Sequence, residues 1–158
     1  MAIDLQNIIP GTGLGSVKFG LSREQVRQML GEPDDIEQQE EGHFRKEKSE
    51  AWHYDDMELS LGFEESDGWR LGNISVASEE YHLHGKSLIG LNRLEAIRSL
   101  NNMGIDDLEY DNEDPEQDMI ASESTGIILW LDEGFVSEIQ WSPLLIDDYT
   151  VKWPELGS

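Results

Sequence analysis

The sequence contains no cysteine and few basic residues. The 158 residues include 11 Lys and Arg against 34 Asp and Glu, which gives a formal charge of −23. Without cysteine the chain forms no disulfide and uses no thiolate chemistry, and this usage fits a reducing compartment. A surface this negative repels phosphate groups. We therefore expect neither nucleic acid nor a membrane as a partner.

Long apolar segments are also missing. No stretch approaches the roughly 20 apolar residues that cross a bilayer. The first residues, Met1 to Gln6, contain no basic region that leads into an apolar run. A secretory signal needs both, so we expect none, and we expect a cytoplasmic protein.

What is present is the composition of a folded domain. Hydrophobic residues make up 37% of the chain, with five Trp, four Phe and four Tyr. High net charge with few large apolar residues indicates disorder, but here the apolar positions are numerous and periodic. We predict a single domain over residues 1–158 that carries its charge on the outside.

A helix pattern occurs twice. In residues 20–33, Ser22 and Gln25 have the spacing of a capping box, and an apolar stripe ends before a Gly and a Pro. In residues 90–104, Asn92 and Glu95 repeat the capping box, and Leu94, Ile97 and Leu100 are expected to face inward. The shared cap chemistry favours an internal duplication, with pseudo-repeats at about 14–84 and 85–145.

Strand patterns follow each helix. Residues 57–63 alternate apolar and polar, a polar turn follows, and residues 71–76 suggest a returning strand with an irregularity at Gly72. Residues 50–63 form either one long strand or two adjoining pieces. The apolar run 127–131 is predicted to be a deeply buried strand or a dimer seam, with a hairpin turn directly after it.

The expected fold class is α+β, with two similar helix-plus-antiparallel-strand halves that share a sheet and a core. Residues 34–49 are charged and almost free of apolar side chains, and residues 106–118 contain eight acids. We expect both segments to be loops, because neither suits a buried element.

The segment Val17–Pro33, which includes the string SREQVR followed by LGEP, resembles an opening found in many small bacterial proteins. It is similar to the helix-plus-sheet repeats of the beta-lactamase inhibitor protein and of small outer-membrane assembly lipoproteins. Similar openings occur in immunity proteins encoded beside bacterial toxins. The resemblance implies a fold, and it carries no binding residue onto a numbered position. Unlike the lipoproteins, this chain has neither a signal peptide pattern nor a Cys to lipidate.

Three patterns suggest chemistry but lack essential parts. Gly11-Thr12-Gly13-Leu14-Gly15 resembles a phosphate loop, yet the third glycine of that motif would fall at Ser16, so we interpret the segment as a turn. His82 and His84 would share one face of a strand, as in a metal site, but a third placed ligand is missing. The acidic segment 106–118 lacks the spacing of a calcium loop. With no nucleophile motif either, we expect no enzyme activity, no cofactor and no resident metal.

The acidic residues are the best functional candidates, because many of them gather in expected loops and hairpin ends, where binding residues are common. Nearby aromatic residues could anchor a protein partner. The predicted partner-binding residues are Asp106, Asp107, Glu109, Tyr110, Asp111, Glu113, Asp114, Glu64, Glu65 and Trp69.

The leading hypothesis is an immunity-type protein that neutralises a basic partner, a cognate nuclease-like toxin, by electrostatic steering and occlusion of its active site. One alternative is a DNA mimic, which requires ordered rows of carboxylates. A second alternative is a metal-dependent enzyme that uses His82 and His84. The sequence leaves the oligomeric state open.

Overall fold

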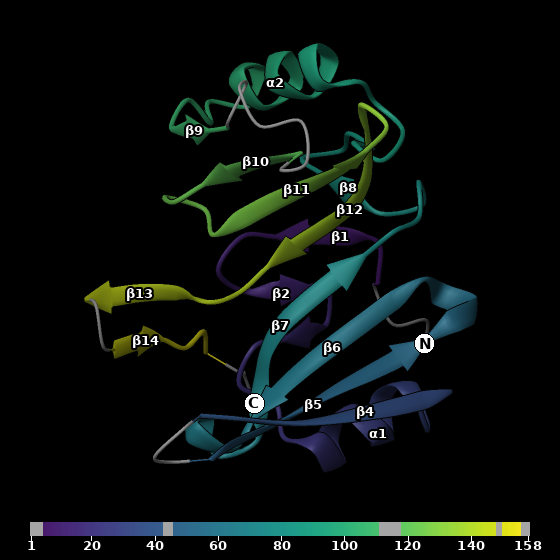
Figure 1. Ribbon diagram of the computed structural model, residues 1–158, viewed down its shortest axis with the longest axis vertical. Helices are drawn as coiled ribbons and strands as arrows, with labels where there is room; N and C mark the ends of the chain where they lie inside the picture. The colour runs from purple at the N-terminus through teal and green to yellow at the C-terminus, as the bar shows by residue number, and fades with distance from the viewer. Residues whose placement is uncertain (1–4, 43–45, 111–117, 148–149, 156–158) are drawn as a thin grey trace.

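A computed structural model describes residues 5–42, 46–110, 118–147 and 150–155. The described residues form two helices, α1 (Arg23–Leu30) and α2 (Arg93–Asn102), together with a large antiparallel sheet and two small sheets (Figure 1). The chain is therefore a mixed α+β protein in which strands predominate, as the sequence predicts.

The large sheet has eight strands in the order β4-β5-β6-β7-β12-β11-β10-β9, and all neighbours are antiparallel. Its strands are β4 (Asp35–Glu41), β5 (Glu47–Tyr54), β6 (Leu59–Glu64), β7 (Arg70–Val76), β9 (Leu108–Glu109), β10 (Met119–Ser122), β11 (Ile127–Asp132) and β12 (Phe135–Trp141). Short 3-10 turns, η1 (Asp55–Met57) and η2 (Glu65–Asp67), follow β5 and β6. Strands β7 and β12, which are distant in the sequence, pair at the centre of the sheet.

The small sheets use short strands. One has the order β3-β2-β1-β8, with a parallel pairing between β1 and β8. Its strands are β1 (Asn7–Ile9), β2 (Gly13–Leu14), β3 (Val17–Lys18) and β8 (His82–Leu83). The other is the hairpin of β13 (Leu144–Asp147) and β14 (Thr150–Lys152), which projects from the body in Figure 1.

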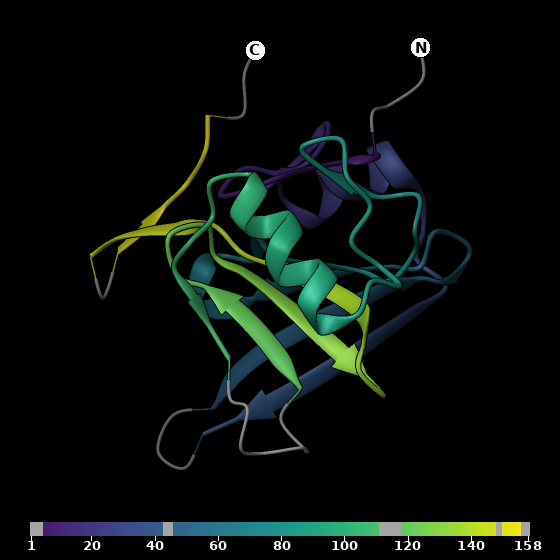
Figure 2. The same ribbon diagram turned by 90° about the horizontal axis from the view of Figure 1, so that it is seen from above.

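The core lies on one face of the large sheet. Alternation along the strands turns Trp52, Phe63, Ile74 and Trp141 to this face, where all four are buried. Figure 2 shows α1, α2 and the first small sheet together on that side. The indole Nε1 of Trp141 donates a hydrogen bond to the carbonyl of Gly13 at 3.1 Å, which joins the two sheets.

Both predicted helix starts are confirmed. Ser22 with Gln25, and Asn92 with Glu95, form complete capping boxes. One expected core residue is wrong: Leu94 lies on the exposed side of α2 with 56% of its surface accessible. The inward prediction is confirmed for Leu100, and Ala96 is the other buried residue of α2.

The strand predictions are partly confirmed. Both expected hairpins form, and the pairing of β6 with β7 shifts beside Gly72, as expected. Residues 50–63 form two strands, which lie antiparallel instead of continuing one line. The run 127–131 is not buried throughout, because Ile128 is half-buried and Trp130 is exposed between buried neighbours.

The prediction of a loop over residues 34–49 is wrong. Residues of this segment form β4 and the start of β5, which pair along seven positions. Strand β4 lies at the edge of the sheet, where Ile36 is its one residue packed against the core and the other described side chains are exposed. In the other expected loop, Leu108 and Glu109 form β9, and residues 111–117 lie outside the described ranges.

Candidate functional site

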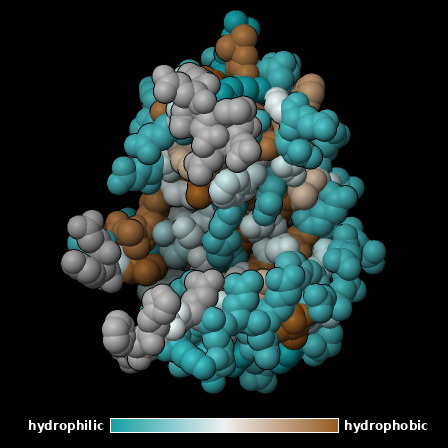
Figure 3. Space-filling view, in the orientation of Figure 1, coloured by the Kyte–Doolittle hydropathy of each residue, from teal (hydrophilic) through white to brown (hydrophobic). Residues whose placement is uncertain are grey.

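The face of the large sheet opposite the core carries a groove. We call this face the open face. Its groove has a volume of about 610 Å³ and crosses β5, β6, β7 and β12. The polar residues of the open face that line it include Ser49, His53, Ser60, Asn73, Ser75, Glu138, Gln140 and Ser142. Figure 3 views the molecule from this side, where hydrophilic residues predominate.

The hollow follows from small side chains in the middle of the sheet. Ala51 and Gly62 are cross-strand partners, and Gly62 pairs in turn with Asn73. A Cβ atom added at Gly62 would lie 3.0 Å from the Cβ of Asn73, so no larger residue fits there without a shift. Gly72 lies at the irregularity next to this pair. Small residues at three adjacent positions therefore leave the space of the groove above the backbone of the sheet.

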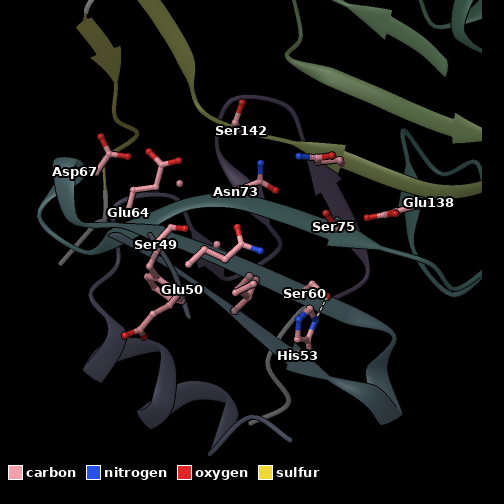
Figure 4. A pocket seen from close by; sticks show the side chains of 17 residues that line it. Ser49, Glu50, His53, Ser60, Glu64, Asp67, Asn73, Ser75, Glu138 and Ser142 are labelled. Carbon is pink, nitrogen blue, oxygen red and sulfur yellow. Dashed lines mark hydrogen bonds between the residues drawn. The ribbon is translucent and has the colours of Figure 1, made fainter. Parts of the chain in front are cut away.

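The groove is negatively charged. Figure 4 shows Glu64 and Asp67 at one end and Glu138 at the other, with Asn73 and Ser75 between them. None of the described residues that line the groove is Lys or Arg. A cationic side chain that entered the groove would therefore meet carboxylates at both ends.

A bound cation would favour the ionised form of one of these carboxyl groups, that of Asp67. Burial raises the pKa of Asp67 above its usual value of 3.8, although Arg70 opposes this change. A second positive charge would favour the ionised form. Glu50 also lines the groove, but its carboxylate already accepts hydrogen bonds from Arg23 at 2.9 Å and from Trp52 at 3.0 Å.

An exposed aromatic residue adjoins the groove. Trp130 is 37% exposed on β11, directly opposite Glu138 on β12. Its Nε1 donates a hydrogen bond to Oε1 of Gln140 at 2.9 Å, which fixes the indole beside a groove residue. Trp130 does not stand out in the sequence, because it lies within a continuous apolar run. Alternation places its side chain on the opposite face from Leu129 and Leu131, but it does not say which face is exposed.

The predicted partner-binding residues that the structure describes lie in two separate parts of the molecule. Asp106, Asp107, Glu109 and Tyr110 are exposed at or near β9, at one edge of the large sheet. Glu64 is the last residue of β6. Between β6 and β9 lie four strands of the large sheet, β7, β12, β11 and β10. The predicted residues Asp111, Glu113 and Asp114 lie outside the described ranges.

Asp107 already has partners within the protein. Its carboxylate accepts hydrogen bonds from the backbone N–H of Ser124 at 2.8 Å and from the hydroxyl groups of Ser122 and Ser124. These hydrogen bonds lower the pKa of Asp107 below 3.8, and the bond from the Ser124 backbone has the largest effect. Asp107 therefore ties the segment before β9 to the turn between β10 and β11.

The remaining predicted residues lie around η2. Glu64 lines the groove, and Glu65 is exposed beside it. Trp69 is half-buried, and the guanidinium carbon of Arg23 lies 4.3 Å from its ring centroid. The structure therefore gives Trp69 an internal packing partner, while Glu64 faces the open side.

The other sequence patterns have structural roles. Gly11 and Gly15 lie in turns that flank β2, which agrees with the turn interpretation. His84 has a φ of 48° directly after β8, so it does not alternate with His82 on one strand. Within the described ranges, neither histidine belongs to a group of three metal-ligating side chains.

Two further observations concern the helices. Helices α1 and α2 each carry a single carboxylate, at Glu24 and Glu95, so neither helix displays a row of acids. Among the described residues, no helix combines the length and the apolar character required to cross a membrane.

Comparison of the chain with protein-family models, curated proteins and solved structures finds no significant match. The resemblance of residues 17–33 to immunity proteins and to the beta-lactamase inhibitor protein therefore stays an expectation drawn from that segment.

Proposed function

We propose that this protein is an immunity-type inhibitor that binds a basic protein, a nuclease-like toxin, on the open face of its large sheet. The observation that carries the proposal is the groove itself, which has carboxylates at both ends and no Lys or Arg among its described lining residues. A cationic loop of the partner fits this charge pattern.

The mechanism needs no chemical step. The net charge of −23 would steer a cationic surface toward the protein and raise the association rate. Glu64, Asp67 and Glu138 would then pair with Lys or Arg side chains that normally hold phosphate. Coverage of the partner's active site is sufficient to block its substrate.

Trp130 supplies the aromatic anchor in this proposal. Interface hot spots favour Trp, because its large rigid ring buries much apolar area at small entropic cost. The bond to Gln140 holds the ring in place before any partner arrives. The binding surface proposed here thus combines Glu64, one of the residues predicted from the sequence, with residues that the sequence did not single out.

We further propose that the two halves of the fold arose by duplication, with repeats at about 14–84 and 85–145. Strand order supports this idea: β4 to β7 fill one half of the sheet in sequence order, and β12 to β9 fill the other in reverse. In each half, a helix with a complete capping box precedes the strands of the large sheet. The open face would then span both repeats, in a cytoplasmic protein.

The test is capture of partners from a lysate of the native cell. The open-face variant combines Glu64→Gln, Asp67→Asn and Glu138→Gln. A matched control removes three exposed carboxylates outside the groove, with Glu24→Gln, Glu80→Gln and Glu133→Gln. Both variants have the same net charge, so they separate a specific surface from general attraction.

We expect wild type and control to capture one strongly basic protein that salt elutes, and the open-face variant to lose it. Purified wild type should then inhibit the activity of that protein, and the association rate should fall steeply as salt rises. Equal capture by both variants, or an association rate that does not depend on ionic strength, would contradict the proposal.

A further inference from the structure

Three metal-ligating side chains meet at one edge of the open face. Asp35 on β4 and His53 on β5 are directly opposite partners in the antiparallel ladder. Glu37 lies two residues beyond Asp35, so its side chain leaves the sheet on the same face. One donor atom from each residue lies within 4.8 Å of the other two, and within the described ranges this is the only group of its kind.

The imidazole of His53 is held in a fixed orientation. Its Nδ1 lies 2.8 Å from the hydroxyl oxygen of Ser60 on β6, as the dashed line in Figure 4 shows. Metal-binding histidines typically donate the proton of their second nitrogen to an oxygen acceptor, which sets the tautomer and orients the other nitrogen toward the ion. Ser60 would have this role here.

The other ring nitrogen has no hydrogen bond. Nε2 of His53 is buried from solvent and makes none, although Oε1 of Glu37 lies 3.3 Å away. A buried polar atom without a hydrogen bond costs free energy, and such atoms are rare in folded proteins. An ion bound to Nε2 would remove this cost.

We propose that Asp35, Glu37 and His53 bind a divalent transition-metal ion, with zinc preferred. Two ligands about 2.1 Å from a tetrahedral ion are about 3.4 Å apart, close to the 3.3 Å between Nε2 and the carboxylate of Glu37. Both carboxylates are exposed. Water completes the coordination.

The donor set selects the ion. Magnesium and calcium prefer oxygen ligands alone, whereas zinc accepts imidazole nitrogen together with carboxylate oxygen. The site differs from the His82 and His84 pair considered from the sequence. It does not depend on the proposed toxin partner, because all three ligands belong to this chain.

The test is calorimetric titration of the protein, purified without a histidine tag, with zinc, manganese and magnesium. The binding variants are His53→Gln and Glu37→Gln. The matched controls are Glu40→Gln, which removes the same charge from the same strand, and the double variant His82→Gln/His84→Gln, which removes two other imidazoles. Circular dichroism checks that each variant folds.

We expect one zinc ion per chain. Both binding variants should lose at least tenfold in zinc affinity, while the controls stay within twofold of wild type. Zinc should also raise the thermal midpoint of wild type and leave that of His53→Gln unchanged, because only the former binds the ion tightly.

Two outcomes would overturn the proposal. In the first, zinc binds wild type no more tightly than magnesium, which leaves His53 and Glu37 as a side-chain contact without a metal. In the second, zinc binds wild type and His53→Gln equally, which indicates loose association with surface carboxylates.

Discussion

At the scale of single residues, Gly13 shows why a glycine-rich segment need not bind a ligand. Its φ is 149°, and a Cβ atom built there would lie 2.2 Å from the carbonyl oxygen of Val17. Its own carbonyl accepts the bond from Trp141. Because Gly13 has no side chain, β2 and β3 can approach each other closely at this point.

Gly13→Ala should strongly destabilise the protein. Backbone strain and overpacking each cost about 1–3 kcal/mol, so we expect a loss of at least about 2 kcal/mol in the free energy of unfolding. Gly85→Ala is the control, because Gly85 also has a positive φ, of 78°, but its added Cβ would meet nothing within 4 Å. Urea denaturation measures both, and equal losses would refute the role assigned to close packing.

Asp107 makes stability depend on pH. Its folded pKa lies below the usual 3.8, so the unfolded chain takes up the proton first as pH falls. Its contribution to stability is then complete above about pH 4 and is lost as pH falls through the folded pKa. We expect Asp107→Asn to lower the thermal midpoint at pH 7, and we expect the difference from wild type to shrink as pH falls from 7 through the folded pKa of Asp107. A constant difference between the two proteins over that range would exclude this role.

At the scale of elements, the helix caps are the part of the fold that the sequence predicts best. A capping box acts within four residues, so its partners are visible in the sequence, and both boxes form as expected. The inward face of α2 was less predictable. Leu94 has helical spacing with the core residues, yet the first turn of α2 projects its side chain to solvent.

Removal of either cap should cost about 1 kcal/mol. We expect this loss in the free energy of unfolding for Ser22→Ala and for Asn92→Ala, because each leaves a backbone N–H of the first turn without its acceptor. Ser66→Ala, at an exposed site in η2, should change stability by less than about 0.5 kcal/mol. Cap variants as stable as Ser66→Ala would show that water replaces the lost bonds.

Strand β4 and the groove could not be predicted from local patterns. Side chains of β4 are mostly exposed, so the strand lacks the apolar alternation that identifies most strands. The groove depends on Ala51, Gly62 and Gly72, which come together only when β5, β6 and β7 pair. Neither residue spacing nor composition reveals which small residues will become neighbours.

At the scale of the whole molecule, charge opposes folding. With 34 acidic and 11 basic residues, most carboxylates have no basic residue available to pair with. Their mutual repulsion is stronger in the compact state than in the unfolded chain, because the charges lie closer together. The buried cluster of aromatic and aliphatic side chains that joins both sheets must outweigh this repulsion.

Added salt should therefore stabilise the protein. The screening length falls from about 30 Å at 0.01 M salt to about 10 Å at 0.1 M, which weakens repulsion across the surface. We expect the thermal midpoint to rise by several degrees over this range of sodium chloride. The open-face triple variant, with three fewer negative charges, should show a smaller rise. A midpoint that falls with salt would mean that attractive ion pairs dominate.

The pairing between β7 and β12 is short, which makes it a place where the large sheet can open. Only three residue pairs join the strands there, including Ser75 with Gln140, whereas β4 and β5 share seven. Ser75 and Gln140 also lie on the floor of the groove. A molecule bound in that groove would contact both β7 and β12. It would therefore oppose separation of the two halves of the sheet. Amide hydrogen exchange at Ile74–Val76 should then slow on binding, even though Ile74 and Val76 face away from the bound molecule.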